Sequence, residues 1–212
     1  MKINEKTLDI SLLLGAFISI MTAMICGFTS KCEEMEDSAF RLHILANSDD
    51  SGDLALKNDV RDYIIEELGF IFDSADTKEE AVKLAERNKT LISDRVNGYL
   101  SKRGVDYKAI CTVEKSRFAT RKYGSYTLPA GEYDSLKIVL GEGKGHNWWC
   151  VLFPTVCIPA ASDRPSPFPE REAYKSEKMR AALTVDGIMS DRRENIEYKF
   201  LAYEWLREVF GF

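Results

Sequence analysis

The first thirty residues constrain this chain more than any other part of it. Residues 10–28 form an uninterrupted run of nineteen uncharged, mostly apolar residues, which is long enough to cross the hydrocarbon core of a bilayer as a helix. Lys2 and Lys6 precede this run, as in a weak signal peptide. Residues 1–30 are therefore predicted to be a signal peptide or an uncleaved N-terminal membrane anchor. The rest of the chain is predicted to lie outside the cytoplasm.

Composition narrows the class of protein that follows this segment. The chain has 212 residues, of which 45% are hydrophobic and 30% charged, so the part after the apolar run is long enough for one globular domain. The net charge of −5 leaves no broad basic surface, so nucleic acid is not expected as a partner. With two histidines and no Cys-x-x-Cys pair, neither a metal site nor a cofactor is expected.

Residues 38–157 are predicted to form one α+β domain. Alternating apolar residues predict strands at 40–46, 105–113, 118–128, 136–140 and 148–153, and the last strand, which is apolar on both faces, is expected to be central. One helix is predicted from an N-cap at Asp53 to Gly69, and a second from the capping box of Thr77 and Glu80 to Arg103. We expect a mostly antiparallel sheet with the two helices packed on one face.

The C-terminal part has a different composition. Four of the six prolines fall within eleven residues, so residues 158–190 are predicted to be a Pro-rich linker or extension. Residues 191–212 are predicted to hold an amphipathic helix, whose apolar side carries Tyr198, Leu201, Ala202, Trp205 and Val209. This side is interpreted as core. Docking on a partner or on a membrane surface remains an alternative.

The glycine run at 141–145 does not match a phosphate-binding loop. A dinucleotide fingerprint needs Gly where His146 stands, and a Walker loop needs Ser or Thr after Lys144, where Gly145 stands. The run is predicted to turn the chain between two strands, with Gly141, Gly143 and Gly145 adopting conformations that need glycine. Its backbone donors also make it a candidate contact surface.

Residues 47–52 partly resemble a calcium-binding loop. Oxygen-bearing side chains alternate along them, but the twelfth position is Asn58 in place of the bidentate Glu that calcium requires. A turn leading into the first helix of the domain is the favoured interpretation.

Cys150 is the one candidate nucleophile, with His146 four residues before it as the candidate base. On a strand the two residues share a face but lie about 13 Å apart, which is too far for direct proton transfer. In an oxidising compartment Cys150 could instead form a disulfide with Cys157. An exported hydrolase or transpeptidase of the cell envelope therefore stands as the alternative function, and a passive module that binds the cell wall as a third.

Several motifs resemble the stage II sporulation protein R family. Two long runs carry most of the resemblance: RLHILANSD at 41–49 and LGEGKGHNWWCVLFP at 140–154. Lys57, the Val-Arg-Asp run at 60–62, the Tyr-Gly pair at 123–124 and PAGEY at 129–133 add to it. Ala119 and Thr155 depart from the prolines usual in the family, which leaves a local bend in doubt.

The resemblance implies a signalling protein of sporulation that is not itself an enzyme. Such proteins are exported from the forespore into the space between the forespore and mother-cell membranes. There they activate a membrane-embedded aspartic protease, which leads to processing of pro-sigma E in the mother cell. We expect Gly141, Gly143, Gly145, Asn147, Trp148 and Trp149 to form the surface that contacts this partner, since tryptophan is common at binding hot spots. A core role for both tryptophans is the alternative.

Overall fold

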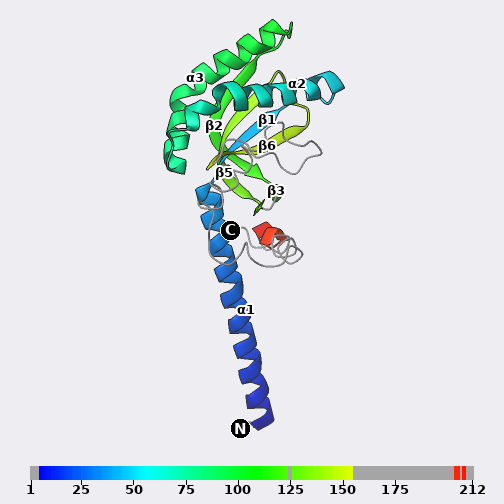
Figure 1. Ribbon diagram of the computed structural model, residues 1–212. Helices are drawn as coiled ribbons and strands as arrows, with labels where there is room; N and C mark the ends of the chain where they lie inside the picture. The colour runs from blue at the N-terminus through cyan, green and yellow to red at the C-terminus, as the bar shows by residue number, and fades with distance from the viewer. Residues whose placement is uncertain (1–4, 124–125, 155–202, 206, 209–212) are drawn as a thin grey trace. The chain divides into compact units, whose positions relative to one another are not determined.

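A computed structural model describes residues 5–123, 126–154, 203–205 and 207–208 of the chain (Figure 1). The chain divides into two compact units, Met1–Glu34 and Met35–Phe212, each with its own set of internal contacts. The predicted linker at 158–190 and the partner cysteine Cys157 lie outside the described residues.

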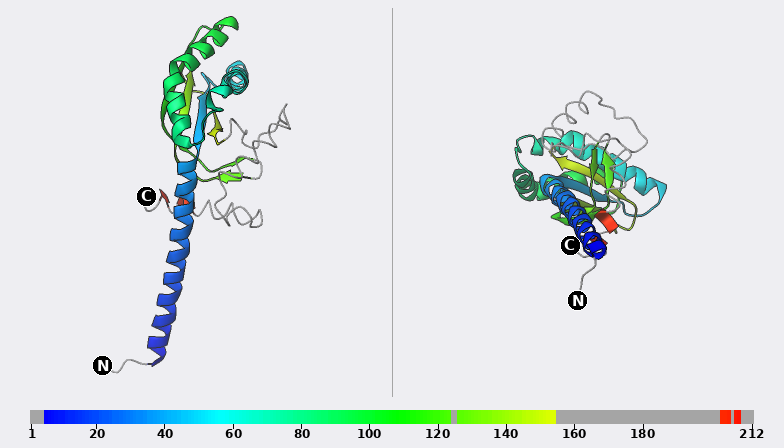
Figure 2. Two further views of the ribbon diagram at one scale, coloured as in Figure 1. Left: turned by 60° about the vertical axis from the view of Figure 1, so that its left-hand side comes forward. Right: turned by 90° about the horizontal axis from the view of Figure 1, so that it is seen from below.

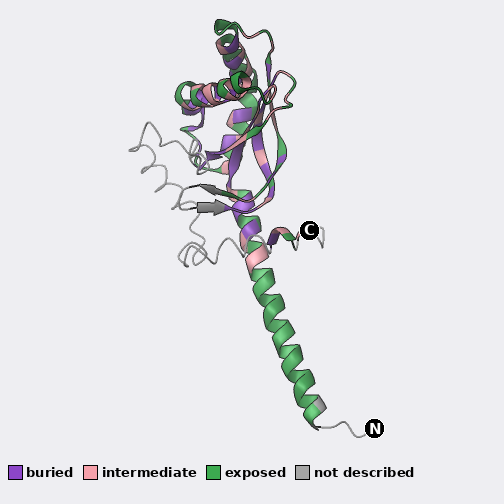
Figure 3. Cartoon of the chain, turned by 90° about the vertical axis from the view of Figure 1, so that its right-hand side faces the viewer, coloured by how far each residue is buried: buried purple, intermediate pink, exposed green. Residues whose placement is uncertain are grey.

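The apolar run at the N-terminus is helical. It belongs to helix α1 (Glu5–Ser38), most of which is coloured as exposed in Figure 3. Its large side chains, such as Leu13 and Phe17, are exposed. Within the described residues, this is the one helix that is long and apolar enough to cross a membrane. Such a helix is compatible with both a signal peptide and a membrane anchor. The acidic residues that follow Lys31 continue the helix to Ser38.

The second unit is α+β, built on a four-stranded sheet with the strand order β2-β5-β1-β6 (Figures 1 and 2). The strands span Phe40–Leu45 (β1), Ala109–Phe118 (β2), Gly131–Leu140 (β5) and Asn147–Phe153 (β6). Strand β1 pairs with β5 in parallel and with β6 antiparallel, and β2 pairs with β5 antiparallel.

The sheet is therefore mixed, and the prediction of a mostly antiparallel sheet was wrong. The error lies in the pairing of β1 with β5, which places Leu42 opposite Leu136 and Ile44 opposite Ile138 in parallel register. Parallel neighbours need a long crossover connection, and the helices, β2 and a hairpin supply it. The expectation that β6 is central was also wrong, because β6 ends the order of described strands.

The two helices of the domain lie largely within their predicted ranges but differ from them at their ends. Helix α2 (Ser51–Tyr63) begins after an N-cap at Asp50, not Asp53, and continues into a π-helical turn (η1, Ile64–Leu68) and a 3₁₀ turn (η2, Gly69–Phe72). Gly69 therefore changes the helix type without ending the helical path. Helix α3 (Lys78–Lys102) matches its prediction, and the Oγ1 atom of its N-cap Thr77 accepts from the backbone N of Glu80 at 3.2 Å.

One hydrophobic cluster unites the helices with the sheet. It combines alternate strand residues such as Leu42, Ile138 and Leu152 with helix residues such as Val60 and Val96, and all five are buried. Figures 1 and 2 show α2 and α3 lying alongside the four-stranded sheet. Burial of these apolar side chains is the main force that holds the helices on the strands.

A second, smaller cluster includes the buried residues Phe118, Tyr133 and Val151, with Trp149 packed against it. Arg41 is fully buried beside it, and its guanidinium lies 3.9 Å from the ring centroid of Phe118 and 4.7 Å from that of Tyr133. These contacts place a cation on aromatic faces, where the ring quadrupoles attract it.

The strand predicted at 118–128 is divided. β2 ends at Phe118, and a separate two-stranded hairpin follows from β3 (Arg121–Tyr123) and β4 (Tyr126–Leu128). The chain then enters β5 at Gly131, five residues before the predicted start of that strand at 136.

The described part of the predicted C-terminal helix is helical at residues 203–205 and 207–208. Tyr203 is buried, whereas Trp205, which the sequence pattern places on the core side, is exposed.

Candidate functional site

The candidate site is the edge of the sheet at which β1 and β5 both end. Because these strands are parallel, the segments that follow them, 46–50 and 141–146, leave the sheet at the same end of the strands. Their backbones are hydrogen-bonded: Lys144 N donates to Asn47 O at 3.1 Å, and Gly145 N donates to Ala46 O at 2.9 Å. We call these two segments the loop pair. The two longest runs that carry the family resemblance thus meet in one structure.

The glycines allow the two loops to approach each other closely. Gly141 has φ +56° and Gly143 has φ +63°, in the left-handed region predicted for this turn. A Cβ atom on Gly141 would lie 2.1 Å from Asn47 Oδ1, and one on Gly145 would lie 2.1 Å from Ser48 O. Gly145 therefore lets the two loop backbones meet, and Gly141 leaves room for the Asn47 side chain.

Asp53 lies beneath the loop pair and holds it to helix α2. Its carboxylate accepts from Ser48 Oγ at 2.6 Å, from Asn47 Nδ2 at 2.8 Å and from Tyr107 OH at 2.6 Å. The hydrogen bond from Ser48 is the main reason that the pKa of Asp53 is lowered, and the bond from Tyr107 adds to it. Asn47 Oδ1 in turn accepts from Glu142 N at 2.9 Å, which connects the two loops.

His146 is held through its backbone and its ring. Asp49 Oδ1 accepts from His146 N at 2.7 Å and lies 2.5 Å from His146 Nδ1. Lys57 Nζ donates to His146 O at 2.9 Å, and burial lowers the pKa of this lysine. The backbone of His146 is therefore fixed from both sides while its ring is exposed.

The two tryptophans point to opposite faces of β6 and do not form one patch. Trp148 packs against the cluster that contains the helices, with the guanidinium carbon of Arg61 lying 4.3 Å from its ring centroid. Trp149 packs on the smaller cluster, with Arg121 lying 4.3 Å from its ring. Both indoles are partly buried, whereas Asn147 beside them is exposed, with its Oδ1 3.0 Å from His43 Nε2.

The proposed pair of Cys150 and His146 is not a catalytic pair in this structure. Cys150 is fully buried in the larger cluster and is disulfide-bonded, so it offers no thiolate. The His146 ring is engaged by Asp49. The predicted disulfide partner Cys157 lies outside the described residues, so that pairing stays a prediction.

Comparison with known proteins decides the family. A family model described as Stage II sporulation protein R matches residues 36–163. The chain belongs to the stage II sporulation protein R family. It is 33% identical over 185 residues to Stage II sporulation protein R of Bacillus subtilis (strain 168), a match that covers 82% of this chain and 83% of that relative. No solved structure matches.

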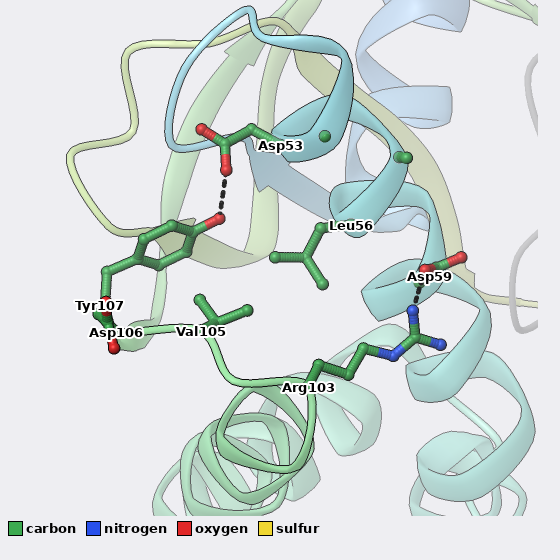
Figure 4. A pocket seen from close by; sticks show the side chains of 9 residues that line it. Asp53, Leu56, Asp59, Arg103, Val105, Asp106 and Tyr107 are labelled. Carbon is green, nitrogen blue, oxygen red and sulfur yellow. Dashed lines mark hydrogen bonds and ion pairs between the residues drawn. The ribbon is translucent and has the colours of Figure 1, made fainter.

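A shallow depression of about 480 Å³ adjoins the loop pair (Figure 4). Leu56 and Val105 lie between the bonded pair of Asp53 and Tyr107 at one end and the ion pair of Asp59 and Arg103 at the other. Within the described residues, no group of three or more His, Cys, Asp or Glu side chains is placed to hold a metal ion.

Sequence reasoning missed the two pairs of residues that border this depression. Tyr107 bonds to Asp53 across 54 positions, and Arg103 pairs with Asp59 across 44. No local pattern relates such distant residues. Lys57 did stand out as part of the family resemblance, although its bond to His146 was not foreseen.

The close approach at Gly145 generates the first prediction. Gly145→Ala should lower the free energy of unfolding by about 1–3 kcal/mol, because the new methyl group would overlap Ser48 O. Gly98→Ala, in α3 with no atom within 4 Å of the added carbon, should raise it by about 0.5–1 kcal/mol. Urea unfolding of the full chain in detergent would measure the stability of both variants. A Gly145→Ala protein as stable as the parent would contradict the close approach of Gly145 to Ser48.

The lowered pKa of Asp53 generates a prediction of pH dependence. The pKa of Asp53 in the folded state lies below the unfolded value of about 3.9. Its contribution to the free energy of unfolding is therefore complete above about pH 3.9 and is lost as the pH falls through the folded pKa. Asp53→Asn should cost about 1–3 kcal/mol at pH 7, because its amide nitrogen would face a hydrogen-bond donor.

The difference in unfolding free energy between this variant and the parent should narrow below about pH 4. Asp106→Asn, an exposed change that lines the same depression, is the control and should leave the stability unchanged. A difference between Asp53→Asn and the parent that is constant from pH 7 to pH 3 would refute the role of the carboxylate.

Proposed function

We propose that this protein is an exported signalling protein of sporulation that activates a membrane-embedded aspartic protease of the mother cell and so leads to processing of pro-sigma E. Family membership supports a role in sporulation signalling. Helix α1 is compatible with export or anchoring. The proposed location is the space between the forespore and mother-cell membranes.

The loop pair is the proposed contact surface, and its geometry is the observation that carries this assignment. The hydrogen bonds between the loops join the two longest family-like runs into one edge. Glu142, Lys144, His146 and Asn147 are exposed along it. A surface held by this many internal bonds loses little conformational freedom on binding.

The predicted contact residues divide into two roles in this proposal. Asn147 is exposed and touches the partner directly, together with the backbone of the glycine loop. Trp148 and Trp149 contribute their partly exposed edges and hold the start of β6 from its two faces. Binding activates the protease by contacting its active arrangement better than its inactive one.

A cell-envelope hydrolase acting through Cys150 gains no support. Such an enzyme requires an accessible thiolate near a base, and Cys150 is buried and disulfide-bonded. In the proposed function the protein therefore acts as a ligand of the protease and has no catalytic activity of its own.

Reconstitution in a non-sporulating host tests the function. The membrane-embedded protease and pro-sigma E are co-expressed with the full chain, with the chain lacking residues 1–30, or without either. We expect processing of pro-sigma E with the full chain alone, because the truncated form is not exported. Absence of processing, with a protease shown to be competent by another activator or mutation, would reject the proposal.

Charge reversal on the loop pair tests the contact surface in the same assay. Lys144→Glu should reduce processing roughly tenfold, which corresponds to about 1.4 kcal/mol of lost binding. Lys89→Glu on α3 is the matched control, because Lys144 and Lys89 are both exposed and each pairs with one glutamate at 2.8 Å. Both variants should unfold at the parental temperature. Equal loss of processing in the two variants would count against a specific surface.

A further inference from the structure

The C-terminal helix docks on the domain by the side that the sequence pattern does not predict. Tyr203 is 2% exposed and Trp205 is 60% exposed. At 100° per residue these side chains point in nearly opposite directions, so the side of the helix that carries Trp205 faces away from the domain. In a globular protein the side of an amphipathic helix that carries a large apolar residue such as tryptophan normally faces the core.

Polar groups hold the docked side in place. Arg207 Nη1 lies 2.6 Å from Glu36 Oε1, and the two side chains are only 22% and 10% exposed. Tyr203 OH donates to the same carboxylate at 3.3 Å. Glu204 Oε1 accepts from both the backbone N and the hydroxyl of Thr120 at 3.1 Å. The orientation of the helix is therefore specified by three side chains.

Glu36 connects this helix to the membrane segment through the chain itself. It lies eight residues after Phe28, the last residue of the apolar run. Eight residues span about 12 Å as a helix and at most about 28 Å when extended. A membrane that holds the apolar run is thus within reach of the C-terminal helix. Tryptophan is enriched at the interface between lipid and water, where the indole ring contacts both.

We propose that Trp205, on the exposed side of the C-terminal helix, inserts into the interfacial layer of the same lipid bilayer that receives the N-terminal apolar run. The residues beside Trp205 do not supply a basic face: Glu204 and Glu208 are acidic, and Arg207 is paired with Glu36. Binding therefore depends on burial of apolar surface and is independent of anionic lipid. This second contact fixes which end of the domain faces the membrane, whether or not the first thirty residues are removed.

Quenching by brominated lipid tests the position of Trp205 in the full chain. The protein is reconstituted in phosphatidylcholine bilayers with or without bromine on the acyl chains, and its fluorescence is compared with that of Trp205→Phe. Subtraction of the variant removes the signals of Trp148 and Trp149. We expect the Trp205 component to be strongly quenched and the remainder to be little affected. A Trp205 component that brominated lipid leaves unchanged would overturn the proposal.

Release of the membrane segment provides an independent test. A protease site is inserted after Ser30, the reconstituted chain is cleaved, and the fraction of the domain retained on sedimented vesicles is measured. We expect the parental domain to stay bound, and Trp205→Glu to lower its partition onto vesicles about tenfold. Phe70→Glu, at an aromatic residue that is 65% exposed, should have no effect.

The lipid composition separates the two modes of membrane binding. Retention should be equal on phosphatidylcholine vesicles and on vesicles with added phosphatidylglycerol. Retention that requires phosphatidylglycerol, or that is the same in Trp205→Glu as in the parent, would refute insertion of Trp205. Circular dichroism of each variant confirms that the exposed substitutions leave the fold intact.

Discussion

The parallel pairing of β1 with β5 is the constraint on which the rest of the domain depends. Two parallel neighbours cannot be joined by a short turn, so everything between Leu45 and Gly131 serves as the crossover. That crossover contains α2, α3, β2 and the hairpin of β3 and β4. The same pairing brings the ends of β1 and β5 to one edge, where the loop pair forms. Core and candidate site are thus two consequences of one strand arrangement.

The sequence predicted the elements better than their partners. Alternation of apolar residues located β1 and most of the other strands, and the capping box at Thr77 located the start of α3, because both signals are local. Strand direction has no local signal, since an alternating strand buries the same residues in either orientation. The capping role predicted for Asp53 was wrong for a related reason. The helix begins at Ser51, and the Asp53 carboxylate bonds to Ser48 and to Tyr107, which is distant in the sequence.

The candidate site was predictable in outline but not in detail. The glycine run was correctly placed in a turn, and the positive φ values follow from it. The separation of Trp148 from Trp149 could have been inferred, because adjacent residues of a strand point to opposite faces. The bond from Lys57 to His146 could not, since it depends on how α2 lies against a loop 89 residues further along the chain.

The contact between Glu36 and Arg207 joins the two ends of the second unit. Glu36 begins the region matched by the family model, and Arg207 is followed by five residues of the given sequence. On the proposed export route the chain emerges N-terminus first, so Glu36 precedes Arg207 by 171 residues. Until Arg207 emerges, the carboxylate of Glu36 lacks the guanidinium that neutralises it in its mostly buried position. On that proposed route the contact between Glu36 and Arg207 forms only after the residues between them have crossed the membrane, so folding of the domain is coupled to its delivery.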